Sequence, residues 1–291
     1  MFFLLGERKR TSHNHQRETF EKVAEPTTFD ALNFRAAIRA SSGHHMVMID
    51  FHQLELRIVA HLSGDEQLQA YFTQHEDVFC AMAAAWFGDG TEHAGLLAER
   101  RARAKRTTYA ILYGTGADGL AHALDVTVDE AQALITDFRH RYPKIQDMKD
   151  RIVRNGKQEG YVETFTGRRR AIPSITSLHP VIASKAERVA INTVVQGTAS
   201  DIVKCGMLRV DAALRAQFAH EPAAPRLVLQ IHDELLFDVP DATLHQAARI
   251  IKASLEAVPR PTTALPFPIR MRVGRSWGEL EDYIGPITLL P

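Results

Sequence analysis

Hydrophobic and polar positions follow two different periods along this chain, and the change of period marks its secondary structure. The apolar run 46–49 predicts a buried strand that ends at Asp50. Through the middle of the chain, apolar residues recur every three or four positions, which is typical of amphipathic helices. Apolar runs return at 227–231 and 235–239 and predict a tight hairpin, and the alternation over 269–273 predicts a half-buried strand. The pattern predicts an α+β fold with strands at both ends and helices between them.

Polar caps and helix breakers set the expected limits of the helices. Thr127 and Glu130 form a capping-box sequence, which predicts a helix that runs to about Tyr142. Residues 179–217 predict one or two helices, with a break near Gln196-Gly197 in the second case. The other expected elements are a short helix at 29–38, a hairpin over 160–172, and helices at 54–62, 66–87, 95–113, 144–158 and 243–257.

Composition narrows the class of protein. The chain has 291 residues, which is room for about two domains. Its 35 Lys and Arg balance 35 Asp and Glu, which excludes binding of a polyanion through global charge but leaves local segregation of charge open. Two cysteines are too few for a disulfide framework or a structural zinc site, and no apolar run is long enough to predict a membrane segment. The chain has no P-loop sequence and no Gly-x-Ser-x-Gly sequence, so a P-loop NTPase is excluded and the commonest hydrolase class has no support.

Two aspartates lie at the ends of predicted strands. Asp50 follows the run 46–49, and Asp233 lies at the tip of the predicted hairpin. A carboxylate at the end of a buried strand is costly unless it is paired, hydrogen-bonded or bound to a metal ion. Two such carboxylates from neighbouring strands can hold two Mg²⁺ ions for phosphoryl transfer. The alternative is that Asp50 caps the next helix and Asp233 is an ordinary turn residue.

Basic and aromatic side chains form a stripe on the helix predicted over 95–113. Arg101, Lys105, Tyr109 and Tyr113 recur every four residues, so they wind slowly along one face of the helix. Such a stripe offers cations for phosphates, followed by rings for a sugar and a base. The alternative is a solvated basic face with two half-buried tyrosines.

Two further groups of polar residues fit nucleic-acid binding without requiring it. Arg188, Asn192 and Gln196 repeat every four residues, as the polar face of any amphipathic helix also does. Residues 166–170 place three arginines beside a glycine, which suits either a grip on a phosphate backbone or a solvated turn. Neither group decides the function by itself.

Taken together, five segments resemble the motifs of the polymerase domain of family-A DNA polymerases, in that family's order and across about residues 34–283. Segments 109–110 and 274–280 are similar to the eukaryotic nu and theta members in particular. The five segments match the first catalytic motif (48–57), the nucleotide-binding fingers helix (101–114), a connecting hairpin (160–169), the template- and primer-contacting helix (188–197) and the second catalytic motif (230–234).

The resemblance implies a role for each matching residue. The catalytic carboxylates would be Asp50, Asp233 and Glu234, and two Mg²⁺ ions would be held by Asp50, Asp233 and the backbone carbonyl of Phe51. Primer-template DNA would contact Arg168, Arg188, Asn192 and Gln196. Glu55 would be the steric gate against a ribose 2′-hydroxyl. The incoming deoxynucleotide would contact Gln53, Glu55, Arg101, Lys105, Tyr109, Tyr113 and His232.

The resemblance also implies an architecture, that of a right-hand polymerase. An antiparallel palm sheet with helices would contain residues 34–70 and 179–291, with a helical fingers subdomain at 71–178 inserted between them, after a poorly ordered segment 1–33. The thumb and the exonuclease domain of the family are expected to be absent. The expected partners are therefore primer-template DNA, deoxynucleotides and a polypeptide that supplies a thumb, and the similarity to nu and theta implies a nuclear location.

Three functions stay open at this point. The first is a DNA-directed DNA polymerase core that transfers deoxynucleotides to a primer 3′-end in DNA repair. The second is a catalytically silent, truncated fragment that acts as a DNA-binding or assembly module, since without a thumb the duplex is held only briefly. The third is a metal-dependent nuclease or phosphatase that uses Asp50 and Asp233, in which the basic stripe has no role.

Overall fold

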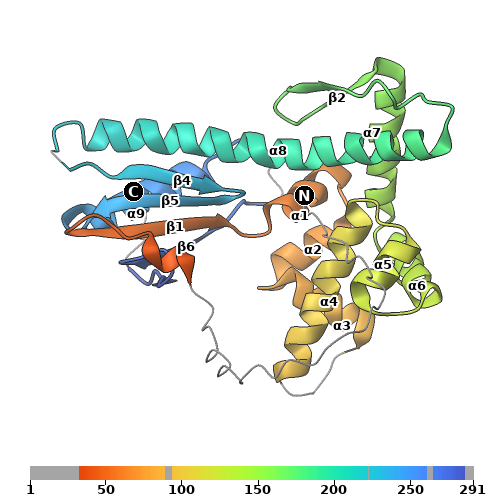
Figure 1. Cartoon of the computed structure of the whole chain (residues 1–291), viewed down its shortest axis with the longest axis horizontal. Coiled ribbons are helices and arrows are strands. Elements are labelled where there is room, and N and C mark those ends of the chain that lie inside the picture. Colours follow the sequence, from red (N-terminus) through yellow and green to blue (C-terminus); the bar gives the residue numbers. More distant parts are fainter. Residues whose placement is uncertain (1–32, 89–93, 222, 261–264, 286–291) are drawn as a thin grey trace, which may run out of the picture.

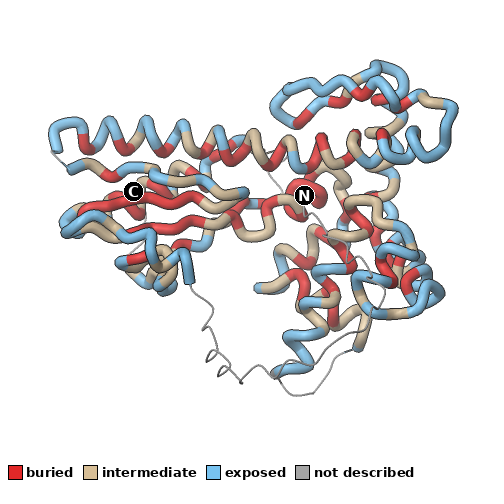
Figure 2. The backbone as a smooth tube through the Cα atoms, in the orientation of Figure 1, coloured by how far each residue is buried: buried red, intermediate tan, exposed pale blue. Residues whose placement is uncertain are grey.

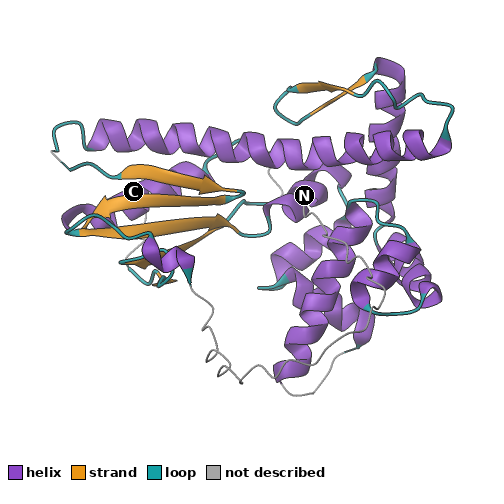
Figure 3. Ribbon diagram, in the orientation of Figure 1, coloured by secondary structure: helices purple, strands orange, loops and turns teal. Residues whose placement is uncertain are grey.

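The computed structural model describes residues 33–88, 94–221, 223–260 and 265–285. Within them a five-stranded sheet lies at one end of the molecule and a group of helices at the other, and one long helix runs past both (Figures 1 and 3). The sheet consists of β1 (His44–Phe51), β4 (Arg226–Ile231), β5 (Glu234–Pro240), β6 (Ile269–Gly274) and β7 (Glu281–Asp282). A separate hairpin pairs β2 (Tyr161–Glu163) with β3 (Arg169–Ala171). The α-helices are α1 (Leu54–Ser63), α2 (Glu66–Gln74), α3 (Val78–Phe87), α4 (Ala94–Leu112), α5 (Ala117–Leu124), α6 (Val128–Arg141), α7 (Pro143–Glu159), α8 (Pro180–Gln217) and α9 (Leu244–Glu256).

The sheet is antiparallel in the order β4-β5-β1-β6-β7, so β1 lies in its centre. Side chains alternate along a strand, which sends Val47, Ile49 and Phe51 to one face and Asp50 to the other. The first face packs against α8 and α9, where these three side chains are 0–1% exposed. Asp50 therefore faces the side of the sheet that is turned away from those two helices.

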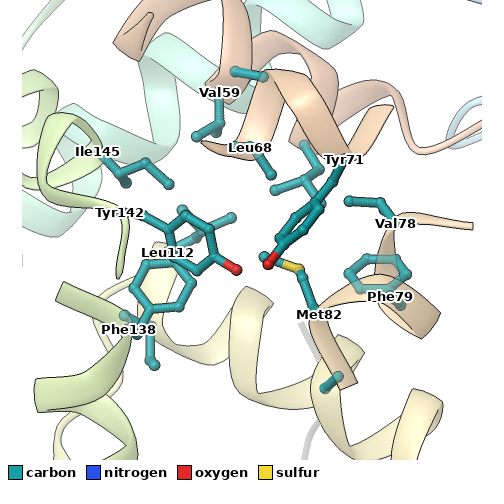
Figure 4. Close-up of a cluster of buried hydrophobic side chains, with 14 of the residues drawn as sticks. Val59, Leu68, Tyr71, Val78, Phe79, Met82, Leu112, Phe138, Tyr142 and Ile145 are labelled. Atoms are coloured by element: carbon teal, nitrogen blue, oxygen red, sulfur yellow. The ribbon is translucent and has the colours of Figure 1, made fainter. Parts of the chain in front are cut away.

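The helical region has an apolar cluster of its own, to which α1 and α2–α7 contribute (Figures 2 and 4). The rings of Phe138 and Tyr142 lie 4.9 Å apart, and Tyr71 meets Tyr142 edge to face. Helix α1 joins the two regions, because Leu56 belongs to this cluster and Ile58 belongs to the cluster under the sheet. The predicted limits of palm and fingers stay a prediction.

Helix α8 is one continuous element of 38 residues and has no break at Gln196-Gly197, which settles the choice between one and two helices. It contributes Val195 to the helical cluster and Ala199 to the cluster under the sheet. Burial along its whole length outweighs the cost of an internal glycine, which is about 1 kcal/mol. In the described ranges no helix, α8 included, is long and apolar enough to cross a membrane.

The prediction of one helix over 66–87 is wrong. The chain leaves the helical path at His75, and Asp77 starts α3 by accepting hydrogen bonds from the backbone N–H of Phe79 (2.9 Å) and Cys80 (3.0 Å). Aspartate is a strong N-cap, and that signal competes with the apolar periodicity that runs through the segment. The capping box of Thr127 and Glu130 is confirmed at the start of α6. The expected helix over 29–38 is a 3₁₀ turn at Phe34–Ala37, with 29–32 outside the described residues.

Candidate active site

Three carboxylates meet at one end of the sheet because of strand register. Asp50 on β1 lies directly opposite Glu234 on β5, and Ile231 lies opposite Glu234 within the β4–β5 hairpin. Asp233 is one of the two residues between those strands. Directly opposed residues have Cβ atoms about 5 Å apart, so Asp50 and Glu234 are neighbours on one face of the sheet. The two strand-end aspartates predicted from the sequence are therefore brought together.

The electrostatics of this end of the sheet favour a bound cation. Burial, and after it the charges of Asp233 and Glu234, raise the pKa of Asp50 to about 6 against the opposing charges of Arg272 and Lys105. One carboxylate oxygen of Glu234, Oε2, is buried without a hydrogen-bond partner among the described residues. Buried negative charge that lacks partners is costly, and oxygen ligands of this kind suit Mg²⁺.

Few of the described side chains at this end of the sheet can serve as metal ligands. Among the described residues no group of three or more His, Cys, Asp or Glu side chains is placed to hold a metal ion. A site here would therefore use two carboxylates and complete its shell with backbone, substrate or water oxygens, which is usual for Mg²⁺. Phe51 is the residue expected to add a backbone carbonyl; its ring is buried under the sheet, and its role stays a prediction.

The turn that presents Asp233 is strained. His232 has a positive φ of 55°, a conformation that a two-residue hairpin commonly requires and that glycine or asparagine usually fills. A larger residue there costs on the order of 1 kcal/mol. The side chain of His232 is exposed at the tip of the hairpin. Gln53 also has a positive φ (58°), at the turn between β1 and α1, and its side-chain oxygen is buried without a partner in the described part of the chain.

A pocket of about 690 Å³ opens beside the hairpin, between α1 and α8. Its lining brings together four residues that the sequence assigned to one site: Glu55, Gln196, His232 and Asp233. The hydroxyl of Tyr113, which directly follows α4, donates a hydrogen bond to Glu55. Burial raises the pKa of Glu55, and that hydrogen bond opposes the rise. The carboxylate of Glu55, which lines this pocket, is therefore held by a tyrosine hydroxyl.

The predicted stripe on α4 is present. The rings of Tyr109 and Tyr113 are stacked, with centroids 6.0 Å apart and planes 15° apart. Phe79 of α3 lies against the stripe: its ring centroid is 5.8 Å from that of Tyr109 and 6.0 Å from the Lys105 amine. Burial raises the pKa of Tyr109, so its hydroxyl stays protonated. The cations and rings of the stripe therefore face the same region as the carboxylates.

Arg101 at the start of the stripe is paired with a carboxylate. Its guanidinium donates two hydrogen bonds to Oδ2 of Asp77, from Nη2 (2.7 Å) and Nε (3.0 Å). The sequence analysis did not single out Asp77. Its position one residue before an apolar helical run was the signal for a cap, but nothing in the spacing indicated a partner 24 residues away.

Arg168 is fixed against α8 by a second aspartate that sequence reasoning missed. Asp201 accepts hydrogen bonds from Arg168 Nε (2.8 Å) and from the hydroxyls of Thr164 (2.8 Å) and Thr166 (2.6 Å). Gly197 allows this approach, because a Cβ there would lie 2.8 Å from Cγ2 of Thr164. The β2–β3 loop is thus held against the middle of α8.

Arg188, Asn192 and Gln196 lie along one side of α8. Asn192 and Gln196 line a pocket of about 350 Å³ together with Arg168, and Oδ1 of Asn192 is buried without a partner among the residues that the structure describes. The stem of Arg188 covers Gly114, where a Cβ would be 2.8 Å from its Cγ. Three of the four residues predicted to contact DNA, Arg168, Asn192 and Gln196, therefore line one pocket, and Gln196 also lines the pocket that contains Asp233.

A sheet whose end carries paired carboxylates, facing a helix of cations and tyrosines, is an arrangement suited to nucleotidyl transfer. The model of DNA polymerase family A matches residues 25–279 of the chain. The chain therefore belongs to DNA polymerase family A.

Individual relatives agree with this assignment. DNA polymerase theta of Drosophila melanogaster is 34% identical over 240 residues, and DNA polymerase I of Chloroflexus aurantiacus is 36% identical over 254 residues. The similar identities do not separate the theta-like members from the bacterial ones. The matched regions cover 81% and 87% of this chain but only 12% and 26% of those proteins, so the chain spans a small part of these relatives.

A solved structure shows the same fold. The polymerase domain of Pol1 from M. smegmatis, in complex with a DNA primer-template and dNTP, superimposes with a TM-score of 0.77 at 31% identity. The match covers 87% of this chain and 44% of that one. The predicted combination of an antiparallel sheet with a helical region inserted between its strands is confirmed.

Proposed function

We propose that this chain catalyses the template-directed transfer of a deoxynucleotide to the 3′-hydroxyl of a DNA primer. The observation that carries the proposal is the meeting of Asp50, Asp233 and Glu234 at the end of the sheet, opposite the stripe of α4. A nuclease or phosphatase would use the carboxylates alone. The cations and stacked tyrosines have a role only if a nucleoside triphosphate is bound between the two groups.

The residues present fit a divalent ion. Asp50 and Asp233 would hold two Mg²⁺ ions, with the carbonyl of Phe51 as a further ligand. Bound there, Mg²⁺ would make the primer 3′-hydroxyl easier to deprotonate and would offset charge on the leaving pyrophosphate. Glu234 adds negative charge beside Asp50, which strengthens the demand for a cation.

The other side of the site positions the nucleotide. Arg101 and Lys105 would bind the triphosphate, whose leaving group gains negative charge as the bond to it breaks. Tyr109 would pack against the sugar, and Gln53 and His232 would contact the nucleotide from the sheet side. Glu55, held by Tyr113, would fill the space that a ribose 2′-hydroxyl needs.

The groove along α8 would hold the primer and the template. Arg168 would offer a phosphate the rest of its guanidinium: Nε donates to Asp201 and Nη2 to the carbonyl oxygen of Gly197 (3.1 Å), and the side chain is half exposed. Asn192 and Gln196 offer amide groups, which can hydrogen-bond to base edges or sugars. Contacts of this kind set the register of the duplex relative to the carboxylates.

Primer extension by the purified chain tests the proposal. The assay uses a primed DNA template, Mg²⁺ and four dNTPs, with Asp50→Asn and Asp233→Asn beside the wild type. Asp211→Asn on the exposed side of α8 is the matched control, since it removes one carboxylate far from the site. We expect extension by the wild type and the control and none by the two site variants.

Other outcomes separate the alternatives. Extension that survives in Asp233→Asn contradicts the proposed site. A folded wild type that binds primer-template but does not extend it supports the silent DNA-binding module. Degradation of the primer without nucleotides supports the nuclease.

The repair role and the nuclear location belong to the same proposal and rest on the resemblance to the nu and theta polymerases. Microscopy of the tagged full chain beside a nuclear marker tests the location. Exclusion of the tagged chain from the nucleus would contradict it.

A further inference from the structure

The carboxylate of Asp77 is divided between two tasks. Its Oδ1 accepts the backbone N–H groups of Phe79 (2.9 Å) and Cys80 (3.0 Å) and so caps α3. Its Oδ2 accepts both hydrogen bonds from Arg101. Burial favours the neutral acid, but the hydrogen bonds from Arg101 and from Cys80 outweigh it and lower the pKa of Asp77. Asp77 is therefore ionised at neutral pH and carries the charge that holds Arg101.

This ion pair lies within the predicted triphosphate site. The guanidinium of Arg101 is 5.9 Å from the ring centroid of Phe79, and the Lys105 amine is 6.0 Å from the same centroid. Both partners are accessible: the side chain of Arg101 is 37% exposed and that of Asp77 is 27% exposed. An exposed ion pair contributes little to stability, so a more highly charged ligand can replace the carboxylate at little cost.

We propose that Asp77 is a positioning residue that holds Arg101 in the nucleotide-free protein and releases it when a triphosphate binds. This inference rests on the proposed function, in which Arg101 binds the triphosphate. The carboxylate keeps the guanidinium ordered, but it also competes with the ligand. It therefore lowers the affinity for the triphosphate, and it takes Arg101 back as pyrophosphate leaves.

The two tasks of Asp77 can be separated by substitution. Asparagine is as good an N-cap as aspartate, so Asp77→Asn keeps the cap of α3 and removes the charge that holds Arg101. Asp77→Ser does the same with a different cap and serves if the asparagine variant fails to fold. Asp65→Asn is the matched control, because Asp65 caps α2 through the backbone N–H of Leu68 (3.0 Å) and undergoes the same chemical change.

Binding of dATP to the full chain, measured by calorimetry with Mg²⁺ present, tests the inference without catalysis. We expect Asp77→Asn to lower the Kd about three- to fivefold, in line with the strength of an exposed ion pair. Asp65→Asn should leave the Kd unchanged. In the Arg101→Ala background the effect of Asp77→Asn should shrink, because the two residues act as a pair. In steady-state extension the same variant should lower KM for dNTP more than it changes kcat.

The outcomes distinguish the inference from the function on which it rests. If Arg101→Ala weakens dATP binding while Asp77→Asn leaves it unchanged or weakens it, the gating role is wrong and the triphosphate site stands. If neither Arg101→Ala nor Lys105→Ala changes dATP binding, the triphosphate site itself is wrong, and the inference falls with it.

Discussion

The sheet end and helix α4 differ in how their charged side chains are paired. At the sheet end, strand register places Asp50 opposite Glu234, and burial together with the charges of Asp233 and Glu234 outweighs the nearby cations, so the pKa of Asp50 is raised. Two residues of the stripe already have partners: Arg101 on α4 is paired with Asp77, and Tyr113, which follows α4, donates to Glu55. If both bind ligands as proposed, the first region would be stabilised by its ligand, and the second would have to exchange partners to accept one.

This difference has a physical origin. Strands in a sheet fix the spacing of opposed side chains, so like charges cannot move apart, and burial together with their repulsion raises the pKa of Asp50. Long side chains on a helix can turn toward any nearby carboxylate. Under the proposed function, the fixed region would position the chemistry and the adaptable region would select the nucleotide.

The largest expected effect comes from removing the repulsion at the sheet end. Asp50→Asn should abolish extension, a loss of at least about a thousandfold, since a ligand to the cation is lost. The same change should raise the thermal stability of the metal-free protein. Activity assays and thermal melts of one preparation measure both effects. An Asp50→Asn protein that is inactive but less stable than the wild type would contradict the destabilising role of Asp50 in the metal-free protein.

The sign of the stability effect follows from the pKa of Asp50. The folded state raises it from 3.8 to about 6, so between these values the folded protein binds more protons than the unfolded chain. Stability is therefore lost as pH rises through this window, and the full penalty is present at pH 7.5. Asp50→Asn removes a penalty of about 1–2 kcal/mol, allowing for partial solvation. Asp282→Asn is the control with opposite sign, because Asp282 is paired with Arg270 (2.7 Å).

A second prediction concerns the contact that joins the two regions. Glu55→Ala should relax discrimination against ribonucleotides by about 10- to 100-fold, because the space beside Tyr113 opens. Tyr113→Phe removes the hydroxyl that donates to Glu55 but keeps the ring, and it should have a smaller effect in the same direction. Competition between dNTP and rNTP in single-nucleotide extension measures both. Unchanged discrimination in Glu55→Ala would contradict the gate.

The strands, the carboxylates and the stripe could be predicted from the sequence because each depends on local periodicity. An apolar run of four residues before Asp50 is enough to place that carboxylate at a strand end. Asp77 and Asp201 could not be predicted in the same way. Their partners lie 24 and 33–37 residues away, and only the packing of α3 on α4 and of the β2–β3 loop on α8 brings them together.

The errors have a similar cause. Helix 66–87 was expected to be continuous because apolar spacing persists through His75–Asp77, but the side chain of Asp77 supplies a better partner to the backbone than another turn would. The opposite happened at Gln196-Gly197, where a glycine that favours a break is held inside α8 by packing on both sides. Tertiary contacts decide such cases, and local sequence does not contain them.

The third prediction tests how rigidly the loop between β2 and β3 is held against α8. Gly197→Ala should lower the affinity for primer-template DNA several-fold and the stability by about 1–2 kcal/mol. A Cβ at this position would meet Cγ2 of Thr164 at 2.8 Å and displace the loop that carries Arg168. Gly95→Ala on α4, where a Cβ meets nothing within 4 Å, is the control and should be neutral or slightly stabilising. Fluorescence anisotropy of labelled DNA reports the affinity, and equal behaviour of the two variants would show that the loop yields easily.

The smallest effect concerns the C-terminal end of α4. Lys149 on α7 donates a hydrogen bond to the carbonyl oxygen of Ile111 in the last turn of α4 (2.9 Å), and burial lowers its pKa to about 8. Because the unfolded chain keeps the ordinary value of 10.5, it binds more protons than the folded protein between pH 8 and 10.5, and the wild type gains stability as pH rises through that window. We expect Lys149→Met to be more stable than the wild type at pH 7.5. That advantage in free energy of unfolding should fall by about 1 kcal/mol at pH 10. Urea unfolding at the two pH values measures it, with Lys157→Met as the control on the exposed side of the same helix. A difference that does not change with pH would mean that the Lys149 ammonium remains hydrated and that the contact between α7 and α4 buries no uncompensated charge.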